Sequence, residues 1–226
     1  MDNENIAQYE RMVSEYLENN KWITNPETNT DPIISFIADR IMEEAMEYEE
    51  SITEFMHSFE QFGEIYLIEL HNRFKKKWRI EEKIQEKIVD GVPLNEAKNY
   101  IKDSLRYTFI VDDSVYTEKV EELIRSIEEK YSLYTFKNSW SNFYYKGINC
   151  SFMLDNGFIF EVQFHTPMSY TVKEGKLRDV YNIIRNPNVD PLMVDISNAI
   201  RLYYQTFVKI PEGAIDFQYE SKKQVK

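Results

Sequence analysis

Polar and apolar side chains alternate along residues 158–165, which sets a row of reactive groups on one side of a strand. Strand side chains point alternately to opposite faces, so the aromatic and valine side chains of this segment share a face that belongs to the core. The other face carries Ile159, Glu161, Gln163 and His165. A carboxylate, an amide and an imidazole in a row can line a site. A half-solvated sheet face is the alternative, but the segment is too apolar for a typical edge strand.

A second carboxylate stands just before another strand-like segment. Residues 106–111 alternate and are rich in β-forming side chains, and Asp103 precedes them. An aspartate at such a junction commonly hydrogen-bonds within its own turn. The alternative is that Asp103 and Glu161 come together on neighbouring strands and hold Mg²⁺, which prefers carboxylate oxygens. Spacing alone leaves both open.

A basic segment is the third candidate for chemistry. Residues 73–83 contain six Lys and Arg in an otherwise acidic chain. If the segment is helical, Lys75, Arg79 and Lys83 form a stripe of like charge, which is unfavourable unless an anion lies opposite. Several cations that converge on one group bind phosphate well, whereas a solvated charged face is the alternative.

The surrounding pattern predicts the elements that must position these residues. We expect a helix over residues 1–22, a mostly helical segment over 33–87 in which Gly63 is a potential break, a short helix over 94–102, and an amphipathic helix over 116–131. Strands are expected at 106–111, 133–136, 148–154 and 158–165, the last two joined by an Asp-Asn-Gly hairpin turn. Helices return after Pro167 and Pro191. Helices around a small sheet with a crossover helix indicate an α+β fold.

Composition narrows the function classes. With 27 Lys and Arg against 39 Asp and Glu, the net charge of −12 argues against a general attraction to nucleic acid or anionic lipid. Three histidines and one cysteine argue against a zinc cluster. The lone Cys150 forms no intrachain disulfide, residues 1–5 are unlike a leader peptide, and no apolar run is long enough to span a membrane. We therefore expect a cytoplasmic protein without a membrane partner.

Together the three segments resemble the synthetase domain of the RelA/SpoT family, in particular the small alarmone synthetases. Arg73-Phe74-Lys75 followed by Ile80-Glu81-Glu82-Lys83 resembles the family's ATP-binding stretch, with Arg79 where a serine is expected. Asp103-Ser104-Leu105-Arg106 resembles its magnesium-binding aspartate and following arginine, one residue closer than usual. Residues 161–166 resemble its Glu-x-Gln-x-Arg-Thr strand, with His165 replacing the arginine.

A fourth segment, Tyr145-Lys146-Gly147-Ile148-Asn149, falls where the family has a Gly-Tyr-Arg-Ser-x-His loop that binds the acceptor. Here Tyr144 replaces the glycine, Gly147 the serine and Asn149 the histidine. The resemblance covers about residues 66–185. The departures cluster in this loop, so they concern the acceptor more than the donor.

The resemblance implies an ATP-dependent pyrophosphokinase that moves the β,γ-pyrophosphate of ATP to a ribose 3′-hydroxyl of a guanosine nucleotide. It implies Mg²⁺ held by the catalytic pair Asp103 and Glu161. The implied ATP-binding residues are Arg73, Lys75, Lys83 and Arg106, and the implied acceptor-binding residues are Tyr145, Lys146, Asn149, Gln163 and His165. It also implies a small mixed-sheet, nucleotidyltransferase-like core at 66–188, between a helical flank at 1–65 and a helical extension at 189–226, in one compact domain.

Two other functions remain open. A toxic synthetase of the same family would modify the tRNA 3′ end or an adenine nucleotide, and an antitoxin or a second copy of the chain could then bind the helical flanks. A non-catalytic nucleotide-binding module would need a lost metal ligand, and both carboxylates are present. A fused hydrolase is excluded, because the chain has only His57, His71 and His165 and no His-Asp pair.

Overall fold

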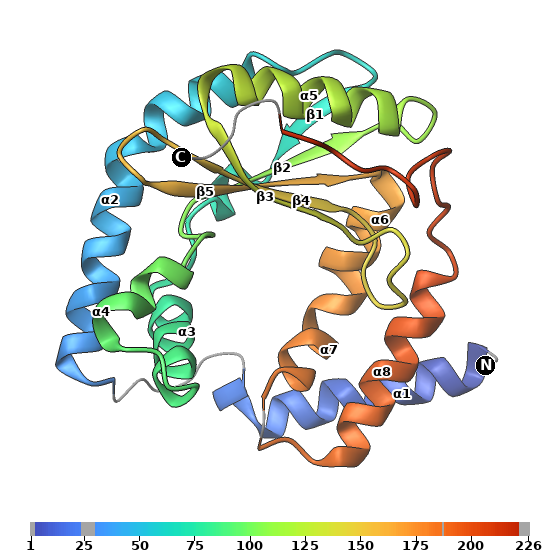
Figure 1. The fold of residues 1–226 in the computed structure, drawn as a ribbon. Helices are drawn as coiled ribbons and strands as arrows, with labels where there is room; N and C mark the ends of the chain where they lie inside the picture. The colour runs from blue at the N-terminus through green and yellow to red at the C-terminus, as the bar shows by residue number, and fades with distance from the viewer. Residues whose placement is uncertain (1–2, 24–29, 187, 222–226) are drawn as a thin grey trace.

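The fold is built on one five-stranded mixed sheet. The computed structural model describes residues 3–23, 30–186 and 188–221. The strands are β1 (Ile65–Ile68), β2 (Arg106–Val111), β3 (Ser132–Asn138), β4 (Ile148–Met153) and β5 (Ile159–His165), in the order β1-β2-β5-β4-β3. Strands β2 and β5 are parallel, and the other pairs are antiparallel (Figure 1). The expected α+β fold is confirmed.

One face of the sheet is apolar and carries the core. The register places Phe109 opposite Phe164 and Tyr107 opposite Val162, and paired residues share a face. Helix α5 (Tyr116–Lys130) covers this face with an apolar stripe that includes Val120, and α2 (Pro32–His57) reaches it where Thr53 contacts the Tyr107 hydroxyl (Figure 1). The main hydrophobic cluster draws members from Ile6 to Phe217.

The opposite face is polar, and helices flank it at both ends. The same register places Arg106 beside Glu161, Thr108 beside Gln163 and Gln163 beside Asn149. On this side of the sheet, α3 (Lys77–Val89) and α4 (Leu94–Ala97) lie under one end (Figure 1). Helices α6 (Pro167–Thr171), α7 (Leu177–Ile184) and α8 (Pro191–Gln205) lie under the other, with α1 (Asn3–Asn19) packed on α8.

Local signals explain where the elements begin. Asp31 caps α2 by accepting from the Ile33 N–H, and Asp190 caps α8 in the same way, each followed by a proline at the first helical position. Thr166 forms a capping box with Ser169 and so ends β5 in a helix start. Gly157 adopts φ +92° in the β4–β5 hairpin, as the Asp-Asn-Gly turn predicts.

The expected helix over residues 33–87 is wrong in its middle. Strand β1 interrupts it, because Ile65 and Leu67 are buried against β2 while Tyr66 points outward. A four-residue edge strand has too few alternations to stand out from a helical pattern. Helix α3 begins at Lys77, so Lys75 lies outside it and the expected helical stripe of three cations does not form.

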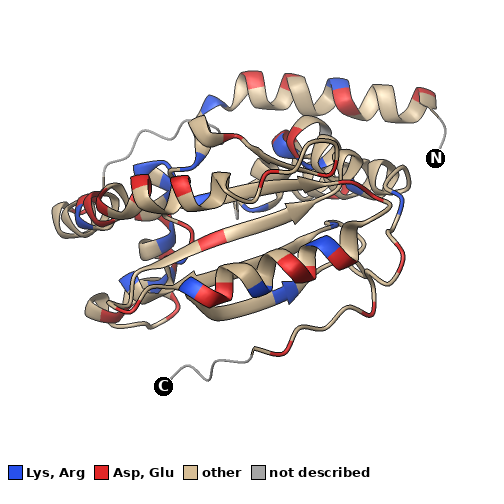
Figure 2. Ribbon diagram, turned by 90° about the horizontal axis from the view of Figure 1, so that it is seen from above, with Lys and Arg blue, Asp and Glu red and all other residues tan. Residues whose placement is uncertain are grey.

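The remaining expected elements lie close to their predicted positions. The short helix expected at 94–102 is α4 followed by a 3₁₀ turn, Lys98–Tyr100. Within the described residues, no helix is long and apolar enough to cross a membrane. Seen from above, Asp and Glu are spread over many elements rather than gathered in one patch (Figure 2).

Candidate active site

Asp103 lies between two lysines at the start of β2. Its Oδ2 is 2.5 Å from Lys75 Nζ, and its Oδ1 is 3.1 Å from Lys83 Nζ. Burial by itself raises the pKa of the Asp103 carboxyl, but the two ammonium groups outweigh burial and lower that pKa to about 2. Burial also lowers the pKa of Lys75, although Asp103 opposes that shift. The result is a buried anion with two cations directed at it.

Two separate elements bring these cations together. Residues 73–75 run alongside the start of β2: the Lys75 N–H donates to the Ser104 carbonyl at 3.0 Å, and the Arg106 N–H donates to the Arg73 carbonyl at 2.8 Å. Lys83 comes instead from α3. The sequence spacing suggested that Lys75 and Lys83 lie on one helix. In the structure Lys75 precedes α3 and only Lys83 belongs to it, and both side chains reach Asp103.

Glu161 lies on the neighbouring parallel strand. It is in register with Arg106, and its N–H donates to the Leu105 carbonyl at 3.0 Å. Gln163 Nε2 donates to Glu161 Oε2 at 2.7 Å, and Asn149 Nδ2 donates to Oε1 at 3.3 Å. The two predicted catalytic carboxylates therefore lie toward the same end of the adjacent inner strands β2 and β5. Lysines hold Asp103, and neutral amides hold Glu161.

Tyr145 and His165 extend this network across the polar face. The Tyr145 hydroxyl donates to Asn149 Oδ1 at 2.7 Å and lies 3.0 Å from His165 Nε2, and the two rings meet edge to face. His165 Nδ1 lies 3.0 Å from Ser169 Oγ. His165 is fully buried, and burial lowers its pKa well below the usual value. A neutral imidazole thus occupies the place where the resembled family has an arginine.

Gly147 makes room for this imidazole. Its φ is +152°, and a Cβ at this position would lie 2.8 Å from His165 Cε1 and 3.0 Å from the Phe164 carbonyl oxygen. Such contacts are too short for any side chain. Gly147 stands where the resembled family has a serine, and His165 stands where it has an arginine. These two departures from the family pattern therefore lie next to each other in the structure.

Three of the predicted residues differ in their engagement with this network. Arg106 is in register with Glu161 on the neighbouring strand, and its charge adds to burial in lowering the pKa of Lys75. Arg73 Nε lies 2.6 Å from Glu49 Oε1 of α2. Lys146 Nζ donates to the Trp140 carbonyl at 2.7 Å, within its own loop.

The structure adds residues that the sequence motifs did not indicate. Lys173 Nζ lies 2.9 Å from Gln163 Oε1 and 2.8 Å from Glu174 Oε1. Lys173 and Glu174 belong to a π-helical turn, Val172–Lys176, between α6 and α7. Glu69 follows β1 and has φ +58°. Burial lowers the pKa of Lys173, and the charge of Glu69 opposes part of that shift. A π-turn is frequent at functional sites, but hydrophobic periodicity does not reveal it.

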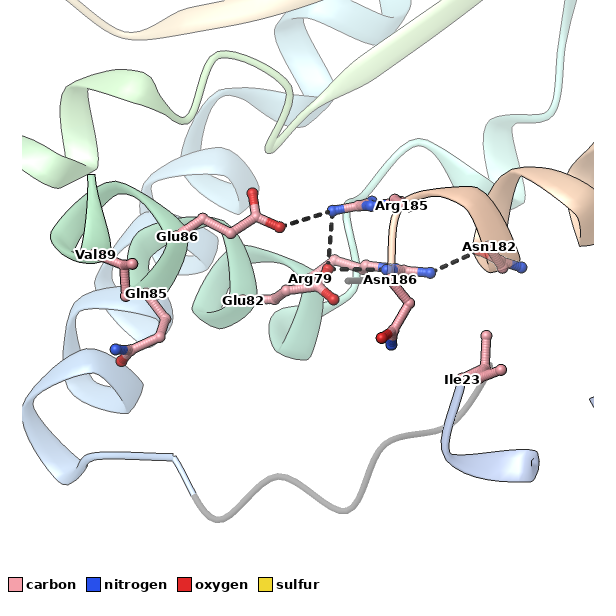
Figure 3. A pocket seen from close by; sticks show the side chains of 9 residues that line it. All are labelled: Ile23, Arg79, Glu82, Gln85, Glu86, Val89, Asn182, Arg185 and Asn186. Carbon is pink, nitrogen blue, oxygen red and sulfur yellow. Dashed lines mark hydrogen bonds and ion pairs between the residues drawn. The ribbon is translucent and has the colours of Figure 1, made fainter. Parts of the chain in front are cut away.

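A cavity of about 330 Å³ lies elsewhere, between α3 and α7 (Figure 3). Arg79 donates to Glu82 at 2.8 Å and to Asn182 at 2.7 Å, and Arg185 lies 2.9 Å from the same Glu82 oxygen. The lining residues are Ile23, Arg79, Glu82, Gln85, Glu86, Val89, Asn182, Arg185 and Asn186. None of them belongs to the Asp103 or Glu161 clusters, so this is a separate site with internally paired charges.

Comparison with known proteins gives structural neighbours only. No family model and no curated protein matches the chain. A protein from Streptococcus mutans UA159 is similar in structure with a TM-score of 0.46 and 10% identity, over 75% of this chain and 87% of that one. A GTP pyrophosphokinase family protein from Streptococcus pneumoniae has a TM-score of 0.44 and 12% identity, over 75% and 85%.

Small alarmone synthetase 1 from Bacillus subtilis, bound to its product pppGpp, has a TM-score of 0.42 and 10% identity, over 75% of this chain and 90% of that one. The neighbours therefore include the family that the sequence motifs resemble. At these identities and TM-scores, the similarity assigns neither an activity nor a substrate to this chain.

Proposed function

We propose that this chain is a nucleotide pyrophosphokinase of the RelA/SpoT type, which transfers the β,γ-pyrophosphate of ATP to the ribose 3′-hydroxyl of a guanosine nucleotide in the cytoplasm. The observation that carries the proposal is the convergence of Lys75 and Lys83 on Asp103, just before β2, next to the parallel strand β5 that carries Glu161. In the transfer, the 3′-oxygen bonds to the β-phosphorus and gives up its proton to solvent. The bond from that phosphorus to the oxygen bridging to the α-phosphate breaks, and AMP leaves with that oxygen.

The donor side fits a polyphosphate. Lys75 and Lys83 direct ammonium groups at one point, which is the arrangement that a phosphate group needs. In the structure, which contains no nucleotide, the Asp103 carboxylate is the anion that both lysines contact. We infer that the phosphates of ATP take over the lysines, which releases Asp103 for a cation. Arg106 is in register with Glu161, and its charge also acts on Lys75. In this proposal it adds positive charge where the transferred group develops negative charge.

The two carboxylates fit a Mg²⁺ that arrives with the nucleotide. Within the described residues no group of three acidic, His or Cys side chains gathers to hold a metal. Mg²⁺ is commonly bound by one or two carboxylates together with substrate phosphates and water, and Asp103 with Glu161 supplies that number. The ion would neutralise phosphate charge. A carboxylate that binds a metal is a poor base, so we assign Glu161, whose two oxygens accept from amides, to the metal rather than to proton transfer.

The acceptor side supports a guanosine nucleotide less directly. The Tyr145 ring can stack on a base, but stacking tolerates any base, and the Tyr145 hydroxyl and the Asn149 amide are already engaged inside the protein. The engaged Asn149, in place of the family's histidine, favours the second candidate, a toxic synthetase acting on the tRNA 3′ end or an adenine nucleotide. Both candidates share the donor site.

The test is to incubate the protein with γ-labelled ATP and Mg²⁺ and to offer GDP, GTP, AMP, ADP and deacylated tRNA separately. We expect label in GDP or GTP, with AMP as the co-product, and none with Glu161→Gln. Label only in tRNA or an adenine nucleotide would establish the second candidate. ATP binding without label in any acceptor would contradict both and indicate a non-catalytic nucleotide-binding module.

A further inference from the structure

Lys173 lies outside every motif, yet it contacts the network around Glu161. The π-helical turn that contains it directs its side chain back over the sheet, where it is 19% exposed. Its Nζ donates to Gln163 Oε1 at 2.9 Å and pairs with Glu174 Oε1 at 2.8 Å. Burial lowers the pKa of Lys173, and Glu174 opposes that shift.

The chemistry of these groups sets the direction of the Gln163 amide. An ammonium group has only donors, so Gln163 must turn its oxygen toward Lys173. The amide nitrogen then faces Glu161 Oε2, at 2.7 Å. If Gln163 turned over, its oxygen would face the carboxylate and its N–H groups would face the ammonium, which are two repulsive contacts. The Glu161 carboxylate, which only accepts, and the Lys173 ammonium, which only donates, thus favour the same orientation of the Gln163 amide.

The other carboxylate oxygen of Glu161, Oε1, accepts a hydrogen bond from the Asn149 amide, which is oriented in a similar way. The Tyr145 hydroxyl donates to Asn149 Oδ1 and thereby leaves the Asn149 N–H for Glu161 Oε1. Each amide is therefore oriented by a donor on its far side. Such outer groups fix the direction of a metal-binding carboxylate and are required for full activity in many sites.

We propose that Lys173 is a positioning residue for Glu161, acting through the Gln163 amide. The proposal rests on the function proposed above, in which Glu161 holds the catalytic metal. Lys173 itself touches neither Glu161 nor, in this proposal, the reacting atoms. Its loss should lower the rate of transfer without weakening the binding of ATP to Lys75 and Lys83.

The test compares three variants. Lys173→Met keeps the length of the side chain and removes the ammonium, and Lys173→Arg restores a donor. Lys119→Met is the matched control, because Lys119 is 20% exposed and ion-paired like Lys173 but lies on α5, on the other face of the sheet. Each protein is labelled with ¹⁵N-glutamine, and the Gln163 side-chain amide signals are assigned by their loss in Gln163→Glu.

In the wild type we expect one Gln163 Nε2 proton to be shifted strongly downfield by its carboxylate acceptor. In Lys173→Met this shift should collapse and kcat should fall about 10–100-fold, with KM for ATP unchanged. Lys173→Arg should recover both readouts in part, and Lys119→Met should change neither. Unchanged Gln163 signals in Lys173→Met would overturn the proposal, whether or not the rate falls.

The nuclear magnetic resonance measurement needs no turnover, so it separates this proposal from the proposed function. If the wild type labels no acceptor, the pyrophosphokinase assignment fails, while the Gln163 amide signals in Lys173→Met still show whether Lys173 orients that amide. If the wild type is active and Lys173→Met moves the amide signals without lowering kcat, only the positioning role is overturned.

Discussion

At the scale of single residues, the two carboxylates of the site have opposite surroundings. Asp103 is neutralised by two ammonium groups, whereas Glu161 accepts only from amides. Asp103 therefore has to exchange ion partners before it can bind a cation, while Glu161 has only hydrogen bonds to give up. We therefore expect that the loss of Glu161 lowers activity, and that the loss of Asp103 lowers the free energy of unfolding.

Glu161→Gln should abolish turnover while leaving the fold intact, because the change is nearly isosteric. Removing a charge that acts in the transition state should cost on the order of 100-fold or more in kcat. Turnover and urea unfolding of the variant and the wild type check this expectation. A near-normal rate would remove Glu161 from the mechanism.

Asp103 should give the protein a component of stability that depends on acid pH. The pKa of this carboxyl is lowered from 3.8 to about 2, so the folded state binds its proton less readily than the unfolded state does. The stabilisation is present above pH 3.8 and is lost as the pH falls through about 2. It amounts to about 2 kcal/mol.

The measurement is urea unfolding of the wild type and Asp103→Asn between pH 2 and 7. The difference in unfolding free energy between the two proteins should shrink as the pH falls through the acid range. A difference that stays constant over this range would show that Asp103 is not held by the lysines in solution.

At the scale of elements, short segments that lie outside the long helices position the site. The extended residues 73–75, the loop at Gly147 and the π-helical turn after α6 each place one group against the sheet. Each depends on a close backbone approach or a hydrogen bond to its neighbour. Small changes in these segments should therefore matter more than changes on the outer helices.

Arg73→Ala and Lys75→Ala should both weaken ATP binding, because each removes a cation from the polyphosphate site. The structure adds that Arg73→Ala also leaves Glu49 without its 2.6 Å partner. We expect both variants to lose about 1–3 kcal/mol of unfolding free energy: Lys75→Ala leaves Asp103 with Lys83 alone, and Arg73→Ala leaves the partly buried Glu49 with only the Thr53 hydroxyl. Calorimetry with a non-hydrolysable ATP analogue and urea unfolding separate the two effects. The exposed Arg125→Ala serves as control, and unchanged ATP affinity in both variants would identify the segment as a merely solvated basic face.

Gly147→Ala should displace the acceptor loop, since the new Cβ would meet His165 at 2.8 Å. Relief of that overlap should cost about 1–3 kcal/mol of unfolding free energy. Gly175→Ala is the matched control, because a Cβ there meets nothing within 4 Å. Equal unfolding free energies for the two variants would contradict the close packing of Gly147 on His165.

At the scale of the whole molecule, the distribution of charge bears on the acceptor. The net charge of −12 is spread over many elements, as Figure 2 shows, while the cations of the site converge locally. A small nucleotide can enter such a local field. A large polyanion must in addition approach an acidic surface, so its binding should depend more strongly on salt.

If tRNA is an acceptor, its labelling rate should therefore fall steeply with added salt. Salt also weakens ATP binding, so the rate has to be compared with that of GDP at the same ionic strength. We expect the ratio of tRNA to GDP labelling to decline as salt rises. A constant ratio would show that the tRNA body makes no phosphate contacts and that only its terminal nucleoside is recognised.

The sequence by itself determined much of the sheet and the identity of the reactive side chains. Alternation in β2 and β5, with Ile110 and Ile159 as exceptions, separates a core face from a polar face, because side chains in a strand have a period of two. The Asp-Asn-Gly turn and the prolines that begin α6 and α8 mark element boundaries through local backbone preference. These are short-range constraints, which a single sequence displays directly.

Only the tertiary structure decided how these groups are partnered. That Lys75 and Lys83 share Asp103, and that Tyr145 lies against His165, depends on residues that are 20 or more positions apart in the chain. Strand β1 and the π-helical turn were missed for the same reason. A short edge strand and an inserted helical residue leave no periodic signal, since contacts with the rest of the fold stabilise them.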